Sequence, residues 1–368
     1  MSSLFKIFLI QFVQEKRTMA SFSVDGVSIE AIYTCVPKNT IRTSDYKFFN
    51  EVECSMFEKT TGIRERRVAQ KNVTCSDLCF EAATKLVSDL AINTDEIDVL
   101  IFVSQSPDYF LPATAIVLQN RLDLKKNTLA FDINLGCSGY VYGLSVIQSL
   151  MSKGLRKGLL LVGDKSTIST CEKDKSAHPL FGDAGTATLL SFNKNSKQKT
   201  YFNLNSDGAG KDSIIIEYGH SRFPYNEFLD DEKEIEKGII RSKNHLALDG
   251  MQIFNFALRE VAKSINSTCE YANYPIERID CFVLHQANKL INDSVRKKLK
   301  QPESKFPMSI ENFGNTSSAS IPLTICFNKD IFSTNKNLTC MLSGFGVGLS
   351  WANAILKLEN LKTDLIEL

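Results

Sequence analysis

The stretch IDVLIFV, residues 97–103, is an uninterrupted apolar run and therefore predicts a buried strand. The segment before it carries Leu78, Ala82, Leu86 and Leu90 at four-residue steps, which predicts an amphipathic helix. A strand without alternation of polar and apolar residues is typical of a sheet that helices cover on both faces. This helix and strand unit therefore predicts a layered α/β architecture.

The pattern returns about 180 residues later, where the apolar run IDCFVL (279–284) follows the helical stretch LREVAKSINSTCEYA. The same offset relates GCSGYVYGLSVIQSLM and GLLLVGD to GNTSSASIPLTICF and LTCMLSGFG. Two copies of one unit predict two pseudo-symmetric halves. We place them at residues 23–195 and 196–368, with the join in the polar segment FNKNSKQKT (192–200).

Residues 1–22 are treated as an N-terminal extension, either disordered or spurious, because Met19 is a second candidate start. Their apolar run is interrupted by Lys6 and followed by QEKR, which makes a poor signal peptide. The run spans about half of the roughly twenty apolar residues that cross a bilayer. We therefore expect no membrane insertion.

The composition of the chain limits its possible binding partners and its cellular compartment. The chain has 43 Lys plus Arg against 42 Asp plus Glu, so no overall field favours nucleic acid or an anionic membrane. Ten cysteines are scattered without the spacing of a disulfide scaffold, which predicts a reducing, cytoplasmic environment. Cys75 and Cys79 have helical spacing but no histidine nearby, so no metal site is expected.

Cys137 stands apart from the other cysteines because glycines flank its turn in INLGCSGYVYGL, residues 133–144. Gly136 and Gly139 allow the backbone to turn sharply from a strand into a helix. The sulfur is then expected at a helix N-terminus, where unpaired amides and the helix dipole favour the nucleophilic thiolate. Taken alone, this cysteine is better explained as a small buried hydrophobe.

Two further polar residues fall at equivalent places in the second half. His285 in VLHQAN follows a buried strand, and Asn315 in NFGNTSSAS precedes the counterpart of the Cys137 helix. Each alone is explained by a core histidine or a turn. Because α/β folds place their chemistry at strand ends beside helix N-termini, the three residues together predict one shared site.

At these residues the sequence resembles the beta-ketoacyl-acyl carrier protein synthase III family of thiolase-like condensing enzymes. The resemblance runs from about residue 23 to the C-terminus. Its ordered motifs are TGIRERRVA (61–69), LPATA (111–115), the Cys137 turn, LFGDAG (180–185), LDGMQIF (248–254), HQAN (285–288), GNTSSAS (314–320) and GFGVGLSW (344–351).

The resemblance implies a thiolase fold with α-β-α-β-α layers, a homodimer, and a catalytic triad of Cys137, His285 and Asn315. It also implies an oxyanion hole made by the backbone N–H groups of Cys137 and Val347. The implied reaction is acylation of Cys137 by an acyl thioester, followed by condensation with malonyl-acyl carrier protein and loss of CO2. Coenzyme A or carrier-protein thioesters are then substrates, and no bound cofactor is expected.

Several positions refine or weaken the resemblance. Met56 and Thr60 stand where relatives that use acetyl-coenzyme A carry a tryptophan and an arginine that grip the nucleotide, so the acyl donor and its chain length stay open. Val347 replaces a glycine, which is harmless unless that residue needs a positive φ. The expected substrate-pocket residues are Leu111, Phe254 and Phe313, and the expected carrier-protein docking residues are Lys289, Arg296, Lys297 and Lys298.

Other functions on the same fold stay open from sequence. Some relatives transfer the acyl group to an alcohol or amine in a specialised pathway and need no malonyl unit. A noncatalytic partner subunit is a further alternative, but such a chain would be expected to lack a triad member. A redox thiol protein is disfavoured because no CxxC pair accompanies Cys137.

Overall fold

The computed structural model describes residues 20–225, 231–332 and 337–368. Residues 1–19, which make up most of the expected extension, lie outside the described residues. The last three residues of that extension, 20–22, begin strand β1 (Ala20–Asp25), which pairs antiparallel with β9 (Lys199–Ser206). These three residues therefore belong to the folded five-stranded sheet.

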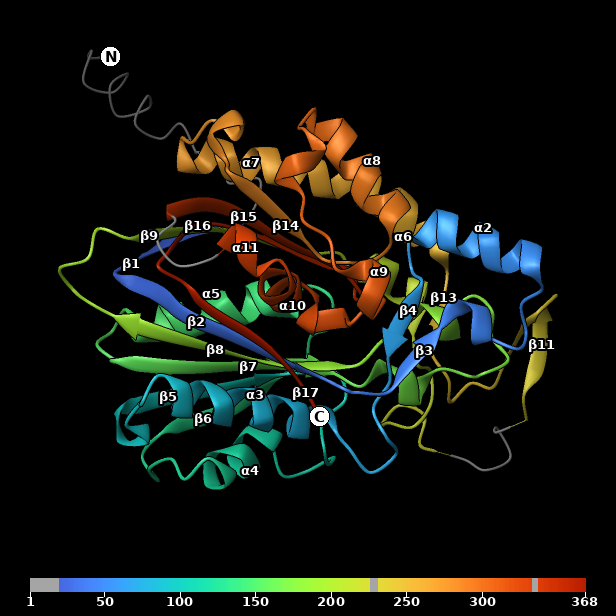
Figure 1. Ribbon diagram of the computed structural model, residues 1–368, viewed down its shortest axis with the longest axis horizontal. Helices are drawn as coiled ribbons and strands as arrows, with labels where there is room; N and C mark the ends of the chain where they lie inside the picture. Colours follow the sequence, from blue (N-terminus) through green and yellow to red (C-terminus); the bar gives the residue numbers. More distant parts are fainter. Residues whose placement is uncertain (1–19, 226–230, 333–336) are drawn as a thin grey trace, which may run out of the picture.

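Two mixed sheets form the framework (Figure 1). The five-stranded sheet has the order β1, β9, β16 (Ser350–Glu359), β15 (Asn337–Gly346) and β14 (Cys281–Leu284). The six-stranded sheet has the order β17 (Lys362–Glu367), β2 (Val27–Val36), β8 (Ala184–Phe192), β7 (Lys157–Asp164), β5 (Ile97–Val103) and β6 (Leu129–Ile133).

The strand directions confirm the internal repeat. In one sheet β7 runs parallel to β5 and antiparallel to β8, which is antiparallel to β2. In the other, β15 runs parallel to β14 and antiparallel to β16, which is antiparallel to β9. The two apolar runs that indicated the repeat, 97–103 and 279–284, thus contain the equivalent strands β5 and β14. The turn after β8, residues 193–198, carries the chain from one sheet to the other.

Helices separate and cover the sheets. In Figure 1, α5 (Gly139–Met151) and α10 (Ser320–Phe327) lie between the sheets, while α3 (Cys75–Asp89) and α4 (Thr114–Arg121) cover the six-stranded sheet. The outer face of the five-stranded sheet carries α7 (Ala262–Ala272) and α8 (Lys289–Leu299). The molecule therefore has the five α-β-α-β-α layers of a thiolase-like fold.

Local sequence explains where these helices begin. Thr74 and Asp77 form a capping box that starts α3, because each side chain bonds the other residue's backbone N–H. Asn288 caps α8 in a similar way by accepting the N–H of Ile291 at 2.8 Å. Tyr140 of α5 and Ile321 of α10 are fully or almost fully buried in one cluster with both sheets. The largest core therefore lies between the two halves.

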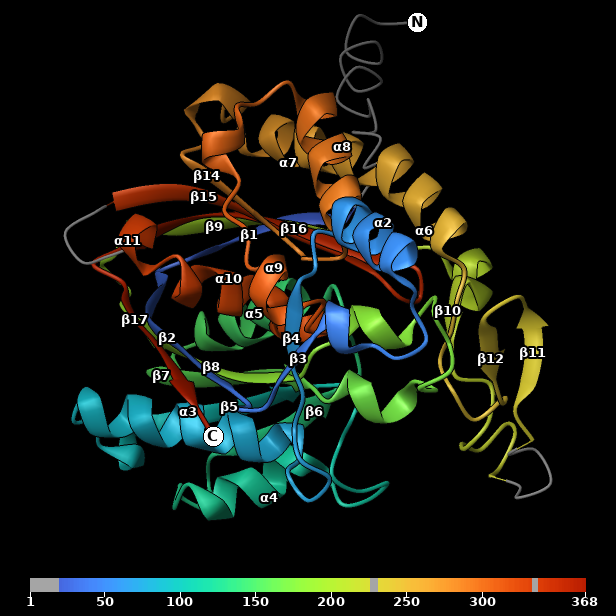
Figure 2. The same cartoon turned by 45° about the vertical axis from the view of Figure 1, so that its right-hand side comes forward.

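Most of the remaining elements gather at one end of the molecule (Figure 2). They are β3 (Thr40–Arg42), α2 (Glu51–Thr61), β4 (Glu65–Arg67), β10 (Ile214–Ile215), β11 (Lys233–Glu236), β12 (Ile239–Arg241), β13 (Ala247–Leu248), α6 (Gly250–Phe256) and α9 (Ile310–Phe313). Helix α11 (Lys329–Phe332) lies apart from them, in contact with α10 and β17. A π-helical segment, Ala257–Val261, joins α6 to α7. Across the described ranges, no helix is both long and apolar enough to span a membrane.

Candidate active site

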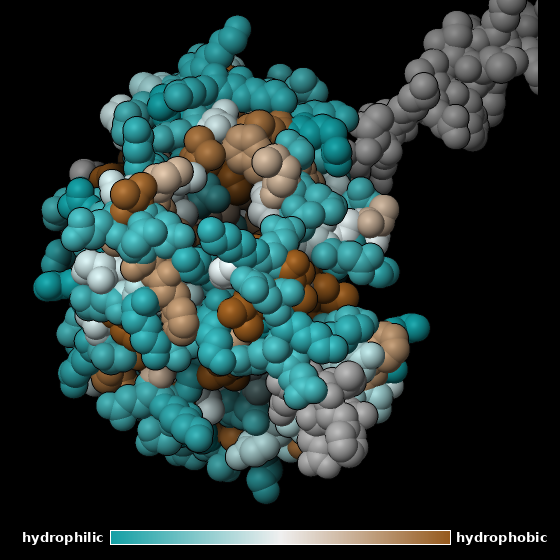
Figure 3. Space-filling model, turned by 90° about the vertical axis from the view of Figure 1, so that its right-hand side faces the viewer, coloured by the Kyte–Doolittle hydropathy of each residue, from teal (hydrophilic) through white to brown (hydrophobic). Residues whose placement is uncertain are grey.

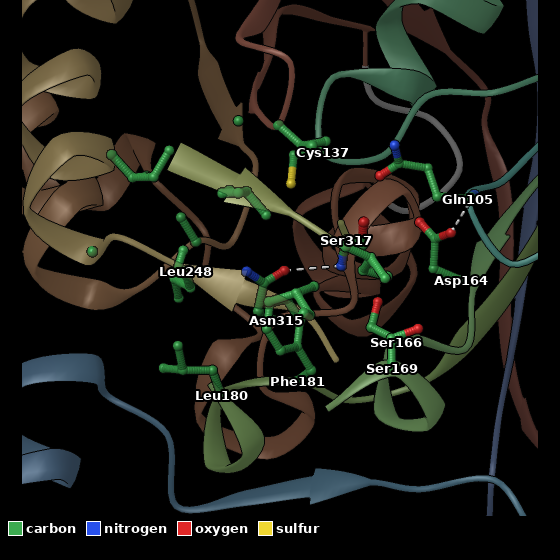
Figure 4. A pocket seen from close by; sticks show the side chains of 18 of the residues that line it. Gln105, Cys137, Asp164, Ser166, Ser169, Leu180, Phe181, Leu248, Asn315 and Ser317 are labelled. Atoms are coloured by element: carbon green, nitrogen blue, oxygen red, sulfur yellow. Dashed lines mark hydrogen bonds between the residues drawn. The ribbon is translucent and has the colours of Figure 1, made fainter. Parts of the chain in front are cut away.

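A cavity of about 630 Å³ brings together the residues predicted from both halves. Cys137, His285, Asn315 and Val347 all line it. Figure 4 shows the sulfur of Cys137 directed into this cavity, with the Asn315 amide on another part of its wall. The convergence expected from the repeat is therefore present in the structure.

Cys137 occupies the turn between β6 and α5, and the end of β15 passes directly over it. A Cβ added to Gly346 would lie 2.6 Å from the Cys137 Cβ and 2.7 Å from its sulfur. Gly346 also has a φ of 158°, which a side chain disfavours. The GFGVG motif therefore contains glycine here because its backbone must approach the thiol.

Val347 places its backbone N–H against the Cys137 sulfur, where the hydrogen bond favours the thiolate. The residues on either side of Val347, Gly346 and Gly348, have positive φ, whereas Val347 does not. A valine is therefore compatible with a backbone that is needed only for its amide. Two amides, of Cys137 and Val347, act on the sulfur at this point.

His285 follows β14, and its backbone N–H donates to the Ser343 carbonyl of the neighbouring strand at 2.8 Å. Its Nδ1 lies 2.7 Å from Ser320 Oγ, which leaves Nε2 as the ring nitrogen available to a substrate. The side chain is 1% exposed, and burial lowers the pKa of His285 to about 3. The imidazole is therefore neutral at physiological pH.

Asn315 is held by its backbone and by its side chain. Its N–H donates to the Leu180 carbonyl at 2.8 Å, and its own carbonyl accepts the N–H of Gly182 at 3.1 Å. The side-chain Oδ1 accepts the N–H of Ser317 at 2.9 Å. Because the oxygen is engaged, Nδ2 is the group that remains to donate to a bound molecule.

The LFGDAG motif (180–185) supports Asn315. A Cβ on Gly182 would collide with the backbone carbonyl of Phe313, so only glycine allows the two loops to touch. Asp183 accepts the N–H of Ala69 at 2.9 Å and the hydroxyl of Thr167 at 2.6 Å. This motif therefore positions an active-site residue of the opposite half.

The Cys137 thiol differs from its sequence-based prediction. We expected the helix N-terminus to favour the thiolate, but the residue is 8% exposed and burial raises its pKa to about 11. The nearby carboxylate of Asp164 raises the pKa further, while the Val347 N–H and the Ser317 hydroxyl oppose the rise. The resting cysteine is therefore a neutral thiol.

Asp164 and Ser317 are residues that the sequence analysis did not single out. Both line the cavity, and both fell within quoted motifs, GLLLVGD and GNTSSAS. Asp164 ends strand β7, so the strand-end rule that selected His285 would also have selected it. Their closeness to Cys137 depends on contacts between residues far apart in the chain.

The three expected pocket residues do not line this cavity in the described part of the chain. Leu111 is 76% exposed on a surface loop. Phe313 is buried instead, with its ring 5.1 Å from that of Phe327 and the Arg67 guanidinium 5.8 Å away. Phe254 is half-buried against the cluster formed by α6, α7 and the five-stranded sheet. Apolar side chains that do line the cavity include Leu180, Phe181, Leu248 and Ile253.

The expected docking residues lie on α8, which directly follows the cavity-lining residues Ala287 and Asn288. Three of them have partners: Lys289 pairs with Asp293 at 2.5 Å, Arg296 Nε lies 3.7 Å from Asp293, and Lys298 donates to the Leu258 carbonyl at 2.7 Å. Lys297 is exposed. The positive charge of this stretch is therefore partly compensated.

Met56 and Thr60 are exposed on α2, and their neighbours Phe57 and Thr61 line the cavity. Figure 3 shows this end of the molecule from outside as a mainly hydrophilic surface with separate hydrophobic patches. Among the described residues, no three His, Cys, Asp or Glu side chains are grouped as metal ligands. All ten cysteines are free thiols.

Family models match two segments of the chain. The model for the 3-oxoacyl-[acyl-carrier-protein] synthase III C terminal matches residues 269–358, and that for 3-oxoacyl-[acyl-carrier-protein] synthase III matches residues 131–208. The two segments together contain the cysteine, histidine and asparagine of the cavity.

Whole-chain comparisons agree. The beta-ketoacyl-[acyl-carrier-protein] synthase III of Clostridium perfringens is 34% identical over 89% of this chain and 97% of its own length. That of Streptococcus mutans is 32% identical over 88% of this chain and 96% of its own. The crystal structure of a 3-oxoacyl-(acyl-carrier protein) synthase from Burkholderia xenovorans superimposes with a TM-score of 0.89, at 38% identity, over 95% of this chain and 99% of that one.

Proposed function

Because this chain belongs to the 3-oxoacyl-[acyl-carrier-protein] synthase III family of condensing acyltransferases, we propose that Cys137, His285 and Asn315 carry out its reaction. The observation that carries the proposal is their meeting on one buried cavity with complementary chemistry. The cavity offers one nucleophile and two neutral groups with free hydrogen-bonding capacity.

In the first half of the reaction, the Cys137 thiolate attacks the carbonyl carbon of an acyl thioester. Negative charge then develops on the carbonyl oxygen, and the N–H groups of Cys137 and Val347 stabilise it. Collapse of this intermediate expels the donor thiol and leaves the acyl group on sulfur. Gly346 makes this possible by bringing the Val347 amide close to Cys137.

In the second half, a malonyl thioester enters the same cavity. His285 Nε2 and Asn315 Nδ2 donate hydrogen bonds to its thioester carbonyl, so that loss of CO2 produces a stabilised enolate. The enolate carbon attacks the acyl carbon, forms a carbon–carbon bond and releases Cys137. A neutral imidazole suits this role because burial keeps the pKa of His285 well below neutrality.

His285→Ala and Asn315→Ala test the assignment. Removal of one donor to a developing oxyanion typically slows a reaction by about a hundredfold or more. We therefore expect each variant to lose release of CO2 from malonyl-acyl carrier protein while it still acquires acyl mass on Cys137. Radiometric CO2 release and intact-protein mass spectrometry measure the two steps separately.

His245→Ala provides a matched control, because His245 lines a different, smaller cavity. It should keep both steps, and Cys137→Ala should lose acylation. Normal decarboxylation by both triad variants would remove the proposed roles of His285 and Asn315.

The finer details of the substrates belong to the same proposal. Acyl carrier protein delivers the malonyl unit beside α8, and the exposed Lys297 is placed to meet its acidic surface. Exposed Met56 and Thr60 offer neither an aromatic face nor a guanidinium, which favours a longer acyl-coenzyme A or a carrier-bound acyl donor. The ten free thiols support work in the cytoplasm.

A homodimer is also part of the proposal. Among the described strands, β6 lies at the edge of its sheet with only β5 as a neighbour, and apolar residues lie exposed around it: Tyr109, Phe110, Leu111, Ile116 and Leu129. The ring of Phe110 lies 5.2 Å from that of His220, which lines the cavity. A second copy covering this surface would therefore lie next to the active site.

A further inference from the structure

One wall of the cavity carries polar side chains that the reaction described above does not use. Ser166 and Ser169 line the cavity from the 3-10 turn that they begin and end, just after β7. Gln105 lines it from the loop after β5. Figure 4 shows these three side chains on one side of the cavity and Leu180 and Leu248 on the other. The cavity therefore has a polar wall, made by Gln105, Ser166 and Ser169, and an apolar wall.

The geometry of the turn explains why both serines face the cavity. A 3-10 helix has about three residues per turn, so the side chains at its first and fourth positions lie on the same face. The two residues between the serines are directed elsewhere, since the Thr167 hydroxyl donates to Asp183 at 2.6 Å and Ile168 is 64% exposed. The Ser169 carbonyl also accepts the N–H of Leu246 at 2.7 Å. These bonds hold the two hydroxyls in place before a substrate arrives.

Gln105 is fixed beside the nucleophile. Its backbone N–H donates to Asp164 at 2.7 Å. Its side-chain oxygen lies so close to Gly136, the residue before Cys137, that a Cβ on that glycine would collide with it. Within the described ranges, neither this side-chain amide nor the two serine hydroxyls have a hydrogen-bond partner. The polar wall can therefore donate and accept hydrogen bonds to a bound molecule.

The charges around the cavity favour a neutral polar group on that molecule. Lys175 donates to both carboxylate oxygens of Glu53, at 2.8 and 3.0 Å. The ammonium of Lys165 donates to backbone carbonyls at 2.6 and 2.7 Å. A carboxylate on the substrate would meet Asp164 of the same cavity, while both of these lysines are already engaged. A hydroxyl avoids this repulsion and can both donate and accept a hydrogen bond.

We propose that the acyl group taken up by Cys137 carries a hydroxyl, which the polar wall binds. This inference rests on the proposed role of Cys137 as the nucleophile. Because Gln105 adjoins the turn that carries Cys137, the hydroxyl belongs on one of the first carbons after the thioester. The hydrocarbon part of the acyl group packs against the apolar wall. A plain hydrocarbon chain in the same space would leave the amide and the two hydroxyls without partners, and burial of such groups is unfavourable.

Two acyl donors of nearly the same shape test this recognition. The 3-hydroxybutyryl and 3-methylbutyryl groups differ only by a hydroxyl or a methyl on one carbon. Both are offered as pantetheine thioesters, so that recognition of coenzyme A or a carrier protein does not affect the comparison. We expect one enantiomer of the hydroxyacyl donor to acylate Cys137 about tenfold or more faster than the methyl donor. Intact-protein mass spectrometry gives both rates.

Gln105→Leu and the double variant Ser166→Ala/Ser169→Ala should each lower this rate ratio by about fivefold, because the hydroxyl loses a partner. Ile168→Ala is the matched control, since it changes the same turn on the side away from the cavity. It should keep the ratio of the unsubstituted protein.

Equal or faster acylation by the methyl donor in the unsubstituted protein would overturn the inference and leave Cys137 as the nucleophile. An unchanged ratio in both variants of the polar wall would also overturn it. If neither donor acylates Cys137, the proposed nucleophile is itself wrong and the inference fails with it.

Discussion

Burial holds both reacting partners of this site in their neutral forms. The pKa of the Cys137 thiol rises to about 11, and that of His285 falls to about 3, mainly because each charged form loses its hydration. Solvation by water is replaced by fixed donors, namely the Val347 amide and the Ser317 hydroxyl. Negative charge on the Cys137 sulfur is therefore stabilised by these two donors instead of by water.

The neutral histidines make a testable contribution to stability. Unfolded histidine titrates near pH 6.5, whereas His285 and His178 have folded pKa values of about 3 and about 4. The unfolded chain therefore binds more protons below pH 6.5, and the free energy of unfolding should fall as pH drops through this window. We expect His285→Asn to reduce the loss of Tm between about pH 7 and 5.

Differential scanning fluorimetry at several pH values measures this loss. His220→Asn replaces an exposed histidine and should follow the unsubstituted curve. Equal losses in all three proteins would show that His285 is not protonated on unfolding.

Whole loops, as well as single residues, determine where the triad lies. Asn315 belongs to the C-terminal half, but backbone bonds to Leu180 and Gly182 of the other half hold it. Helix α5 is fixed in a comparable way, because Ser138 Oγ meets Ser350 Oγ at 2.7 Å. Each half therefore positions a reactive group of its counterpart, and the site depends on correct docking of the two.

Gly182→Ala tests this dependence. The added Cβ would meet the Phe313 carbonyl, and the loop carrying Asn315 must move. We expect unfolding to become easier by about 1–3 kcal/mol and condensation to fall by about tenfold or more, because small displacements of a positioned group are costly. Acylation of Cys137 should be less affected.

Urea denaturation and the two-step assay of acylation and CO2 release measure these effects. Gly208→Ala is the control, since no atom lies within 4 Å of its added Cβ. If Gly182→Ala condenses malonyl thioester at the unsubstituted rate, LFGDAG does not position Asn315.

At the scale of the molecule, the pattern of apolar residues predicted the layers of helices and sheets. The motifs repeated in the two halves predicted that Cys137, His285 and Asn315 converge. The apolar runs at 97–103 and 279–284 contain β5 and β14. A buried strand can be recognised from its own apolar residues, without knowing which strands pair with it. Long-range contacts were the part that could not be predicted. Phe313, for example, packs against Phe327 instead of lining the cavity.

The loop before α4 gives the strongest structural support for the proposed homodimer. Asp132 of β6 accepts the N–H groups of Thr114 and Ala115, both at 2.7 Å, so the loop carrying Phe110 and Leu111 is anchored at its end. Those two side chains are 71% and 76% exposed. An anchored loop that presents large apolar side chains beside an unpaired sheet edge is typical of an interface.

Leu111→Asp should therefore weaken self-association, because a carboxylate would be buried without a partner when two copies meet. We expect the dissociation constant to rise by about tenfold or more, seen by light scattering as a shift from twice the chain mass toward the chain mass. Ile235→Asp introduces the same charge at a 56% exposed position on β11 and should leave association unchanged.

Since Phe110 contacts His220 at the cavity, loss of the dimer should also slow acylation of Cys137. An unaltered dimer in Leu111→Asp would place the interface on another face, and the exposed loop would then need a different partner.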